Sequence, residues 1–159
     1  MVAAVQKLEA MSLAQKEQLV EVICRDQPAM LASVVVQKQM GVAIEKIEFL
    51  LELLLVCFLA MKESTLDWPA ITEDDQDRQM RRYVATVKFG RDLGKSLQSQ
   101  ATKQYVLNHP EKPLLAFTVD RIVRWLVHIR AEETDKYVIL AAINFVNCIA
   151  TCAMPKTKL

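Results

Sequence analysis

Three sets of polar residues carry side chains suited to acid–base or hydrogen-bonding chemistry, and all three have the same spacing. The glutamate set is Glu45, Glu48 and Glu52, the basic set is Arg121, Arg124 and His128, and the asparagine set is Asn144, Asn147 and Thr151. Because an α-helix turns about 100° per residue, positions i, i+3 and i+7 lie within an arc of about 60°. Each set therefore presents its side chains on one face of a helix.

The glutamate set begins a helix that becomes almost wholly apolar. Apolar residues continue the same arc beyond Glu52, so we expect this carboxylate at the border of a core or an interface. A carboxylate held there without a partner is costly. The sequence therefore predicts charge-assisted hydrogen bonds between the glutamate set and the basic set, within one chain or across a dimer. The alternative is two ordinary solvated faces, because amphipathicity alone produces this spacing.

The asparagine set suggests a different role, because it lies in an otherwise apolar segment. Asn144 and Asn147 would line a polar pocket between helices or form hydrogen bonds across a homodimer. Alternatively, they would satisfy one another and nearby carbonyl groups. The pocket hypothesis extends to a cleft for a small ligand, lined by Glu52, Arg124, His128 and Asn147.

Known catalytic and metal-binding motifs are missing from the sequence. A di-metal carboxylate bundle needs Glu-x-x-His pairs on facing helices, and the two histidines, His109 and His128, are not preceded by such glutamates. The sequence also lacks a Gly-x-Ser-x-Gly elbow and a glycine-rich phosphate loop. We therefore expect no metal and no cofactor, and we favour a non-enzymatic function.

Four cysteines, Cys24, Cys57, Cys148 and Cys152, each lie within an apolar helical pattern. Their spacing does not resemble the disulfide framework of a small secreted domain. Cys148 and Cys152 share a helix face, but no CxxC pair supplies further zinc ligands. The pattern predicts four reduced core thiols in a cytoplasmic protein.

Composition indicates a globular chain with no strong electrostatic preference. The 159 residues are 52% hydrophobic and 25% charged, which is typical of one domain that spans residues 1–159. The net charge of +1 gives no general attraction to nucleic acid or anionic lipid. Residues 137–154 are uncharged and about long enough to cross a membrane. The asparagines within them would need partners in lipid, so we expect a buried core helix and no membrane role.

Helical signals run through the whole chain and predict an all-α bundle of about six or seven helices. Ser12 and Gln15 form a capping box, Pro28 suits a first helical turn, and Thr72 is placed to cap the helix that follows it. Gly41 either ends a helix in the left-handed conformation or lies inside one longer helix. The tail at residues 155–159 is expected to fray.

An apolar stripe marks the helix that carries the basic set. Its residues recur at steps of four and three, which predicts packing against a neighbouring helix. The stripe is Leu115, Val119, Ile122, Leu126 and Ile129.

Two stretches, residues 24–35 and 108–119, each break a helix and begin another with proline. They suggest a degenerate two-part pseudo-repeat.

We expect the helix near residues 42–62 and the last helix to form the centre of the bundle. Apolar surface in excess of what these helices can cover predicts a homodimer. The sequence thus favours an interaction or regulatory protein that self-associates through apolar helices, and it leaves room for a further protein partner. The alternative is a small-ligand-binding protein or enzyme with the polar cleft described above.

Overall fold

The computed structural model describes all residues except 65, 92–94, 153 and 156–159. The described residues form eight α-helices, one short 3₁₀ helix and a two-residue strand pair, which confirms the all-α prediction. The elements are α1 (Val2–Glu9), α2 (Leu13–Asp26), α3 (Pro28–Val35), η1 (Val36–Lys38), α4 (Ile44–Glu63), β1 (Leu66–Asp67), α5 (Glu73–Arg91), α6 (Lys95–Asn108), α7 (Lys112–His128), α8 (Asp135–Cys152) and β2 (Met154–Pro155).

Local capping chemistry sets several of these boundaries as predicted. The Ser12 hydroxyl accepts a hydrogen bond from the Gln15 backbone N–H, and the Gln15 side chain accepts one from the Ser12 N–H. This capping box separates α1 from α2, which gives one helix more than the expected six or seven. Gly41 has a φ of 81° and ends the turn after η1, so the left-handed alternative is the one observed. The Thr72 hydroxyl accepts from the Asp75 N–H at the start of α5.

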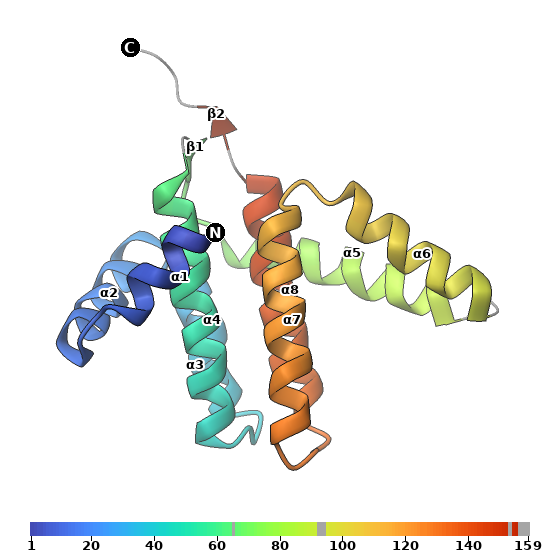
Figure 1. The fold of residues 1–159 in the computed structure, drawn as a ribbon, viewed down its shortest axis with the longest axis horizontal. Coiled ribbons are helices and arrows are strands. Elements are labelled where there is room, and N and C mark those ends of the chain that lie inside the picture. The colour runs from blue at the N-terminus through green and yellow to red at the C-terminus, as the bar shows by residue number, and fades with distance from the viewer. Residues whose placement is uncertain (65, 92–94, 153, 156–159) are drawn as a thin grey trace.

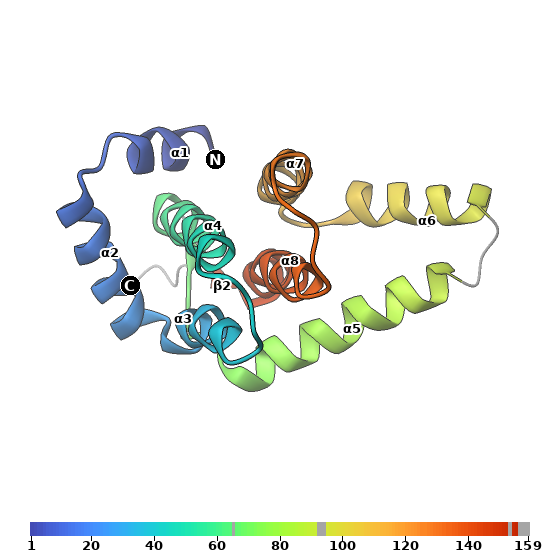
Figure 2. The ribbon, with the colours of Figure 1, turned by 90° about the horizontal axis from the view of Figure 1, so that it is seen from below.

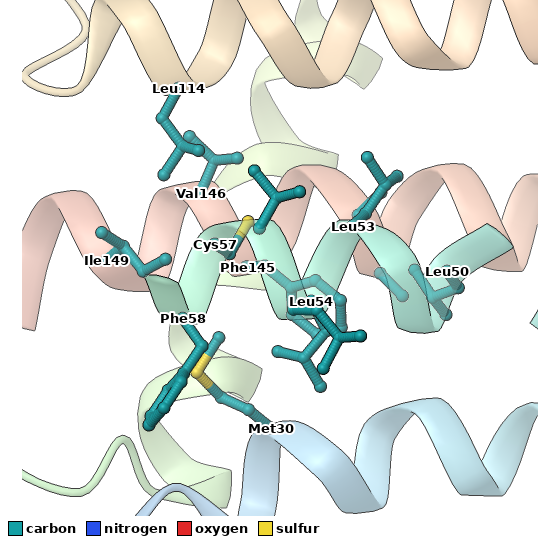
Figure 3. Close-up of a cluster of buried hydrophobic side chains, with 14 of the residues drawn as sticks. Met30, Leu50, Leu53, Leu54, Cys57, Phe58, Leu114, Phe145, Val146 and Ile149 are labelled. Atoms are coloured by element: carbon teal, nitrogen blue, oxygen red, sulfur yellow. The ribbon is translucent and has the colours of Figure 1, made fainter. Parts of the chain in front are cut away.

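The core lies between α4 and α8, the two helices expected at the centre. Leu53, Leu54 and Cys57 of α4 are buried against α8, where Phe145 and Val146 are also buried. Figure 3 shows these side chains together with residues from α3 and α7 that close the cluster. Burial of many large apolar side chains is the main favourable contribution to folding here.

The four helices before β1 (α1–α4) and the four after it (α5–α8) repeat one contact pattern. In each group, the first and third helices pack on the fourth, and the second packs on the third. The fourth helices, α4 and α8, pack on each other, while α3 contacts α8 and α7 contacts α4. Figure 2 shows α1–α4 on one side of the molecule and α5–α8 on the other, with α4 and α8 adjacent at the centre. The stretches at residues 24–35 and 108–119 span equivalent junctions, from the end of α2 into α3 and from the end of α6 into α7.

A short antiparallel strand pair joins the middle of the chain to its end. Leu66 pairs with Pro155, and Asp67 pairs with Met154. No strand was predicted here, because two residues are too few to show an alternating pattern. Of the predicted frayed tail, Pro155 belongs to β2, and residues 156–159 lie outside the described residues.

A buried glutamine holds the connection between α4 and α5. Gln27, at the junction of α2 and α3, has 2% of its surface exposed. Its Nε2 donates to the Pro69 carbonyl at 3.0 Å, and its Oε1 accepts from the Ile71 N–H at 2.8 Å. One side chain thus satisfies two backbone groups of the loop that links the two halves.

Candidate functional site

The predicted contact between the glutamate set and the basic set is present at one pair of residues. Arg121 Nη2 of α7 lies 3.3 Å from Glu52 Oε2 of α4. The two side chains are 44% and 53% exposed, so water screens this pair and its contribution to stability is small. The core border lies one turn further along α4, where Leu55 and Val56 are buried.

The other members of the two sets have different neighbours. Arg124 Nε lies 2.9 Å from Asp120 Oδ2 on its own helix, and His128 Nδ1 lies 2.7 Å from the Arg124 carbonyl oxygen. Glu45 and Glu48 are exposed on α4, and among the described residues they form no ion pair. The structure therefore brings Glu52 and Arg121 together and leaves the remaining residues of both sets apart.

Only one pair of the two sets comes together because α7 packs mainly on α8 and approaches α4 over a short length. One apolar contact between α7 and α4 is a stacked pair, Phe49 and Trp125, whose ring centroids are 4.6 Å apart with an interplanar angle of 1°. Such a stack adds to the stabilisation from buried area. It positions α7 beside α4 so that Arg121 reaches Glu52, whereas Arg124 lies further around α7 from that side.

Asn147 joins α8 to the end of α6. Its Oδ1 accepts a 2.6 Å hydrogen bond from the Tyr105 hydroxyl and lies 3.2 Å from His109 Nε2. The Glu111 backbone N–H donates to His109 Nδ1, so the neutral ring carries its hydrogen on Nε2 and donates it to Asn147. Burial raises the pKa of Tyr105, which keeps its hydroxyl protonated as a donor.

Asn144 points to a different neighbour from Asn147. Its Nδ2 donates to the Gln76 carbonyl of α5 at 3.1 Å, whereas the Thr151 hydroxyl donates to the Asn147 backbone carbonyl on α8 itself. The asparagine set thus connects α8 to α5 and α6. The residues of the predicted cleft do not converge: Arg124 and His128 contact each other on α7, whereas Glu52 contacts Arg121 and Asn147 contacts Tyr105.

A buried ion pair that the sequence analysis missed joins the beginnings of α4 and α8. Lys46 Nζ contacts the carboxylate of Asp135, the carboxylate of Glu132 at 2.9 Å and the Arg130 carbonyl at 3.2 Å. The side chains of Lys46 and Asp135 are each 8% exposed. Lys46 precedes Leu50 by four residues, so its place on the core-facing side of α4 was visible in the sequence.

For both Lys46 and Asp135, the combined effect of pairing on the pKa is larger than the opposing effect of burial. Burial acts to raise the pKa of Asp135, but hydrogen bonds from the Lys46 ammonium and the Glu132 N–H hold that pKa below its usual value. Burial acts to lower the pKa of Lys46, and the two carboxylates raise it instead. Both groups are therefore ionised at neutral pH. Their contact aligns the first turn of α4 with the first turn of α8.

The outward side of α7 presents an uncovered apolar surface. We call Val119, Val123, Leu126 and Val127 the α7 outer face; they are between 40% and 76% exposed. Their spacing places them within an arc of about 100°. Of the predicted stripe, Leu115 and Ile122 are buried in the core, while Val119 and Leu126 belong to the outer face. Figure 2 shows α7 lying on α8, with no described helix on its opposite side.

The cysteines differ in exposure. Cys57 and Cys148 are buried, and burial raises the pKa of each thiol to about 12. Cys152 is half-buried, and Cys24 is exposed, which corrects the prediction that all four lie in the core. Cys24 is exposed because α2 buries little beyond Ile23. Among the described residues, no group of three or more His, Cys, Asp or Glu side chains is arranged to hold a metal ion.

By length and composition, α8 is the one helix of the described part of the chain that qualifies as a membrane span. In the fold, 61% of that segment is buried. Residues 141–149 form a continuous buried run that packs on α4, α5 and α7. The position of α8 at the centre of the bundle accounts for its apolar composition.

Comparison with models of protein families, with curated proteins and with solved structures found no match to this chain. The chain's own surface is therefore the basis for a functional proposal. The feature on which we base that proposal is the α7 outer face, where four exposed aliphatic side chains lie on one side of a helix.

Proposed function

We propose that the chain is a non-enzymatic helical interaction or regulatory protein that forms a symmetric homodimer through the α7 outer face. The observation that carries this proposal is the exposure of Val119, Val123, Leu126 and Val127 on one side of one helix. A contiguous exposed apolar patch with a polar margin is typical of a protein–protein interaction site. A twofold-symmetric contact covers the same patch on both copies.

An antiparallel arrangement of two α7 helices is favoured by the order of residues. A twofold axis at Val123 places Val119 of one copy opposite Val127 of the other, since both lie four residues from the axis. Apolar side chains of similar size then meet along the contact. Val123 meets its own counterpart at the centre.

The charges beside the outer face are complementary under the same symmetry. Asp120 and Arg124 lie along one edge of the outer face and form an ion pair within the helix. In the antiparallel arrangement, Asp120 of each copy lies about two residues, or ~3 Å along the axis, from Arg124 of the other copy. Opposite charges therefore meet on that edge, which is the pattern that selects a partner and its register.

The size of the surface sets the expected strength of association. Since α7 has 17 residues, it is about 25 Å long. One helix face of this length buries an area at the low end of specific interfaces. We therefore expect a weak dimer, with a dissociation constant in the micromolar range.

The chemistry of the described nucleophiles supports a non-enzymatic role. Cys57 and Cys148 are protonated and enclosed in the core, and both ring nitrogens of His109 are occupied by structural hydrogen bonds. An exposed thiol at Cys24 fits the reducing cytoplasm. The proposal accordingly places the protein there.

Sedimentation velocity over a range of concentrations tests the dimer. We expect the wild-type protein to shift from monomer to dimer as its concentration rises through the micromolar range. Val123→Glu places two carboxylates at the axis and should abolish the shift. Because Val123 is exposed, the change should leave the monomer folded.

The matched control is Leu13→Glu, the same kind of change at an exposed position of α2. This variant should dimerise like the wild type. A wild-type protein that stays monomeric at hundreds of micromolar, or equal dimerisation of Val123→Glu, would contradict the proposal.

A further inference from the structure

The described residues line a cavity that is open to solvent, on the opposite side of α8 from α7. It has a volume of about 370 Å³ and lies between η1, α5 and the first half of α8. Its lining is mainly apolar and includes Met40, Met80, Val84 and Leu140. The volume lies within the range of small-molecule sites.

Two buried acceptors belong to residues that line this cavity. Gln37 and Asn144 are each 5% exposed. Among the residues that the structure describes, Gln37 Oε1 and Asn144 Oδ1 have no hydrogen-bond partner. A buried acceptor without a donor is costly, so a molecule that donates hydrogen bonds to these two oxygens would gain binding energy.

The orientation of both amides is fixed by their donors. Gln37 Nε2 donates to the Ser33 carbonyl at 3.0 Å, and Asn144 Nδ2 donates to the Gln76 carbonyl at 3.1 Å. Rotating either amide would place its oxygen against another carbonyl oxygen. Both side chains therefore offer acceptors, and a ligand must supply the donors.

The charge of the lining limits which ligands the cavity can accept. Asp77 is the one charged residue among the described residues of the wall, and it lies at the exposed margin, where it pairs with Arg81. With acceptors inside and a carboxylate at the margin, an anion would be repelled. The cavity suits a neutral or cationic molecule.

We infer that this cavity binds a small apolar molecule that carries N–H or O–H donors, with Gln37 and Asn144 as the acceptors. Neither oxygen is exposed to solvent, so the ligand reaches them by moving a side chain of the wall. Met40 and Met80 have the unbranched, adaptable side chains that permit this movement. The inference is independent of dimerisation through α7.

Three probes with one apolar body test the chemistry of the cavity. They are 1-naphthylmethylamine, which donates hydrogen bonds from its N–H groups, 1-methylnaphthalene, which has no donor, and 1-naphthoate, which is an anion. Each is titrated into the ¹⁵N-labelled full chain and followed by NMR. The amine should bind saturably and shift signals from η1, α5 and α8, with an affinity about three- to tenfold above that of 1-methylnaphthalene. The naphthoate should bind weakest.

Gln37→Met removes one acceptor while keeping an unbranched side chain of similar length. It should lower the affinity for the amine about three- to tenfold and leave 1-methylnaphthalene unaffected. The matched control is Gln39→Met, the same substitution at an exposed neighbour, which should bind like the wild type.

Several results would overturn the inference. These are no binding of the amine, equal binding of all three probes, signal changes confined to other helices, and an unchanged amine affinity in Gln37→Met. If Gln37→Met fails to fold, the ranking of the three probes and their mapped position on the wild type still decide the question.

Discussion

Replacing Gln27 by leucine should loosen the junction between the two halves of the molecule. The change keeps an apolar volume of similar size but removes two hydrogen bonds, to the Pro69 carbonyl and from the Ile71 N–H. Ile71 is buried, so its N–H would be left without a partner. An unsatisfied buried group costs about 1–3 kcal/mol, and the second hydrogen bond adds about 1 kcal/mol. We expect a loss of about 2–4 kcal/mol in the free energy of unfolding.

Urea denaturation followed by circular dichroism measures this loss. With a slope of about 2 kcal/mol per molar for a chain of this size, the midpoint should fall by about 1–2 M. Gln27→Glu gives a sharper check, because a glutamate at this position must be protonated to donate to the Pro69 carbonyl. Burial should raise its pKa in the folded state above the unfolded value of about 4.3.

The sign of the pH dependence follows from that shift. A carboxyl group whose folded pKa is raised stabilises the fold more as the pH falls. The difference in midpoint between Gln27→Glu and the wild type should therefore shrink when the pH is lowered from about 7 to about 5. A loss below about 0.5 kcal/mol for Gln27→Leu, or a pH-independent deficit for Gln27→Glu, would refute the role given to this side chain.

Two further predictions concern the buried ion pair and the thiols. Because the pKa of Asp135 is held below its usual value, its contribution to stability is present at neutral pH and is lost as the pH falls below about 4; Asp135→Asn should lower the urea midpoint at pH 7 and flatten its decline in acid, and parallel acid profiles would contradict this. Ellman's reagent should modify Cys24 fastest in the native protein, the half-buried Cys152 more slowly, and Cys57 and Cys148 only after unfolding. Cys24→Ser should therefore remove the fastest phase, and rapid modification of a core thiol would contradict the burial described here.

Features governed by neighbours in the sequence were predictable. The capping box at Ser12, the first-turn position of Pro28 and the cap at Thr72 all depend on residues within a few positions of one another. The central place of α4 and α8 followed from their apolar composition. These signals are complete in the local sequence, so the structure confirms them.

Features that depend on how helices face each other were predicted in part. The shared spacing predicted contact between the whole glutamate set and the whole basic set, and one exposed pair, Glu52 and Arg121, is in contact. Spacing does not specify which part of α7 approaches α4. The Phe49–Trp125 stack decides that. In the same way, the sequence marked Asn147 as a polar residue to be satisfied, but Tyr105 is 42 residues away, and no local signal identifies it.

Cysteine cross-linking at the twofold axis tests the proposed dimer most directly. In a Cys24→Ser background, Val123→Cys should form a disulfide between two copies, because the axis brings these residues together. Val119→Cys alone should not, since its two copies would lie about 12 Å apart along the helices, but a mixture of Val119→Cys with Val127→Cys should cross-link. Equal cross-linking of Val119→Cys and Val123→Cys, or none in any combination, would contradict an antiparallel contact through α7.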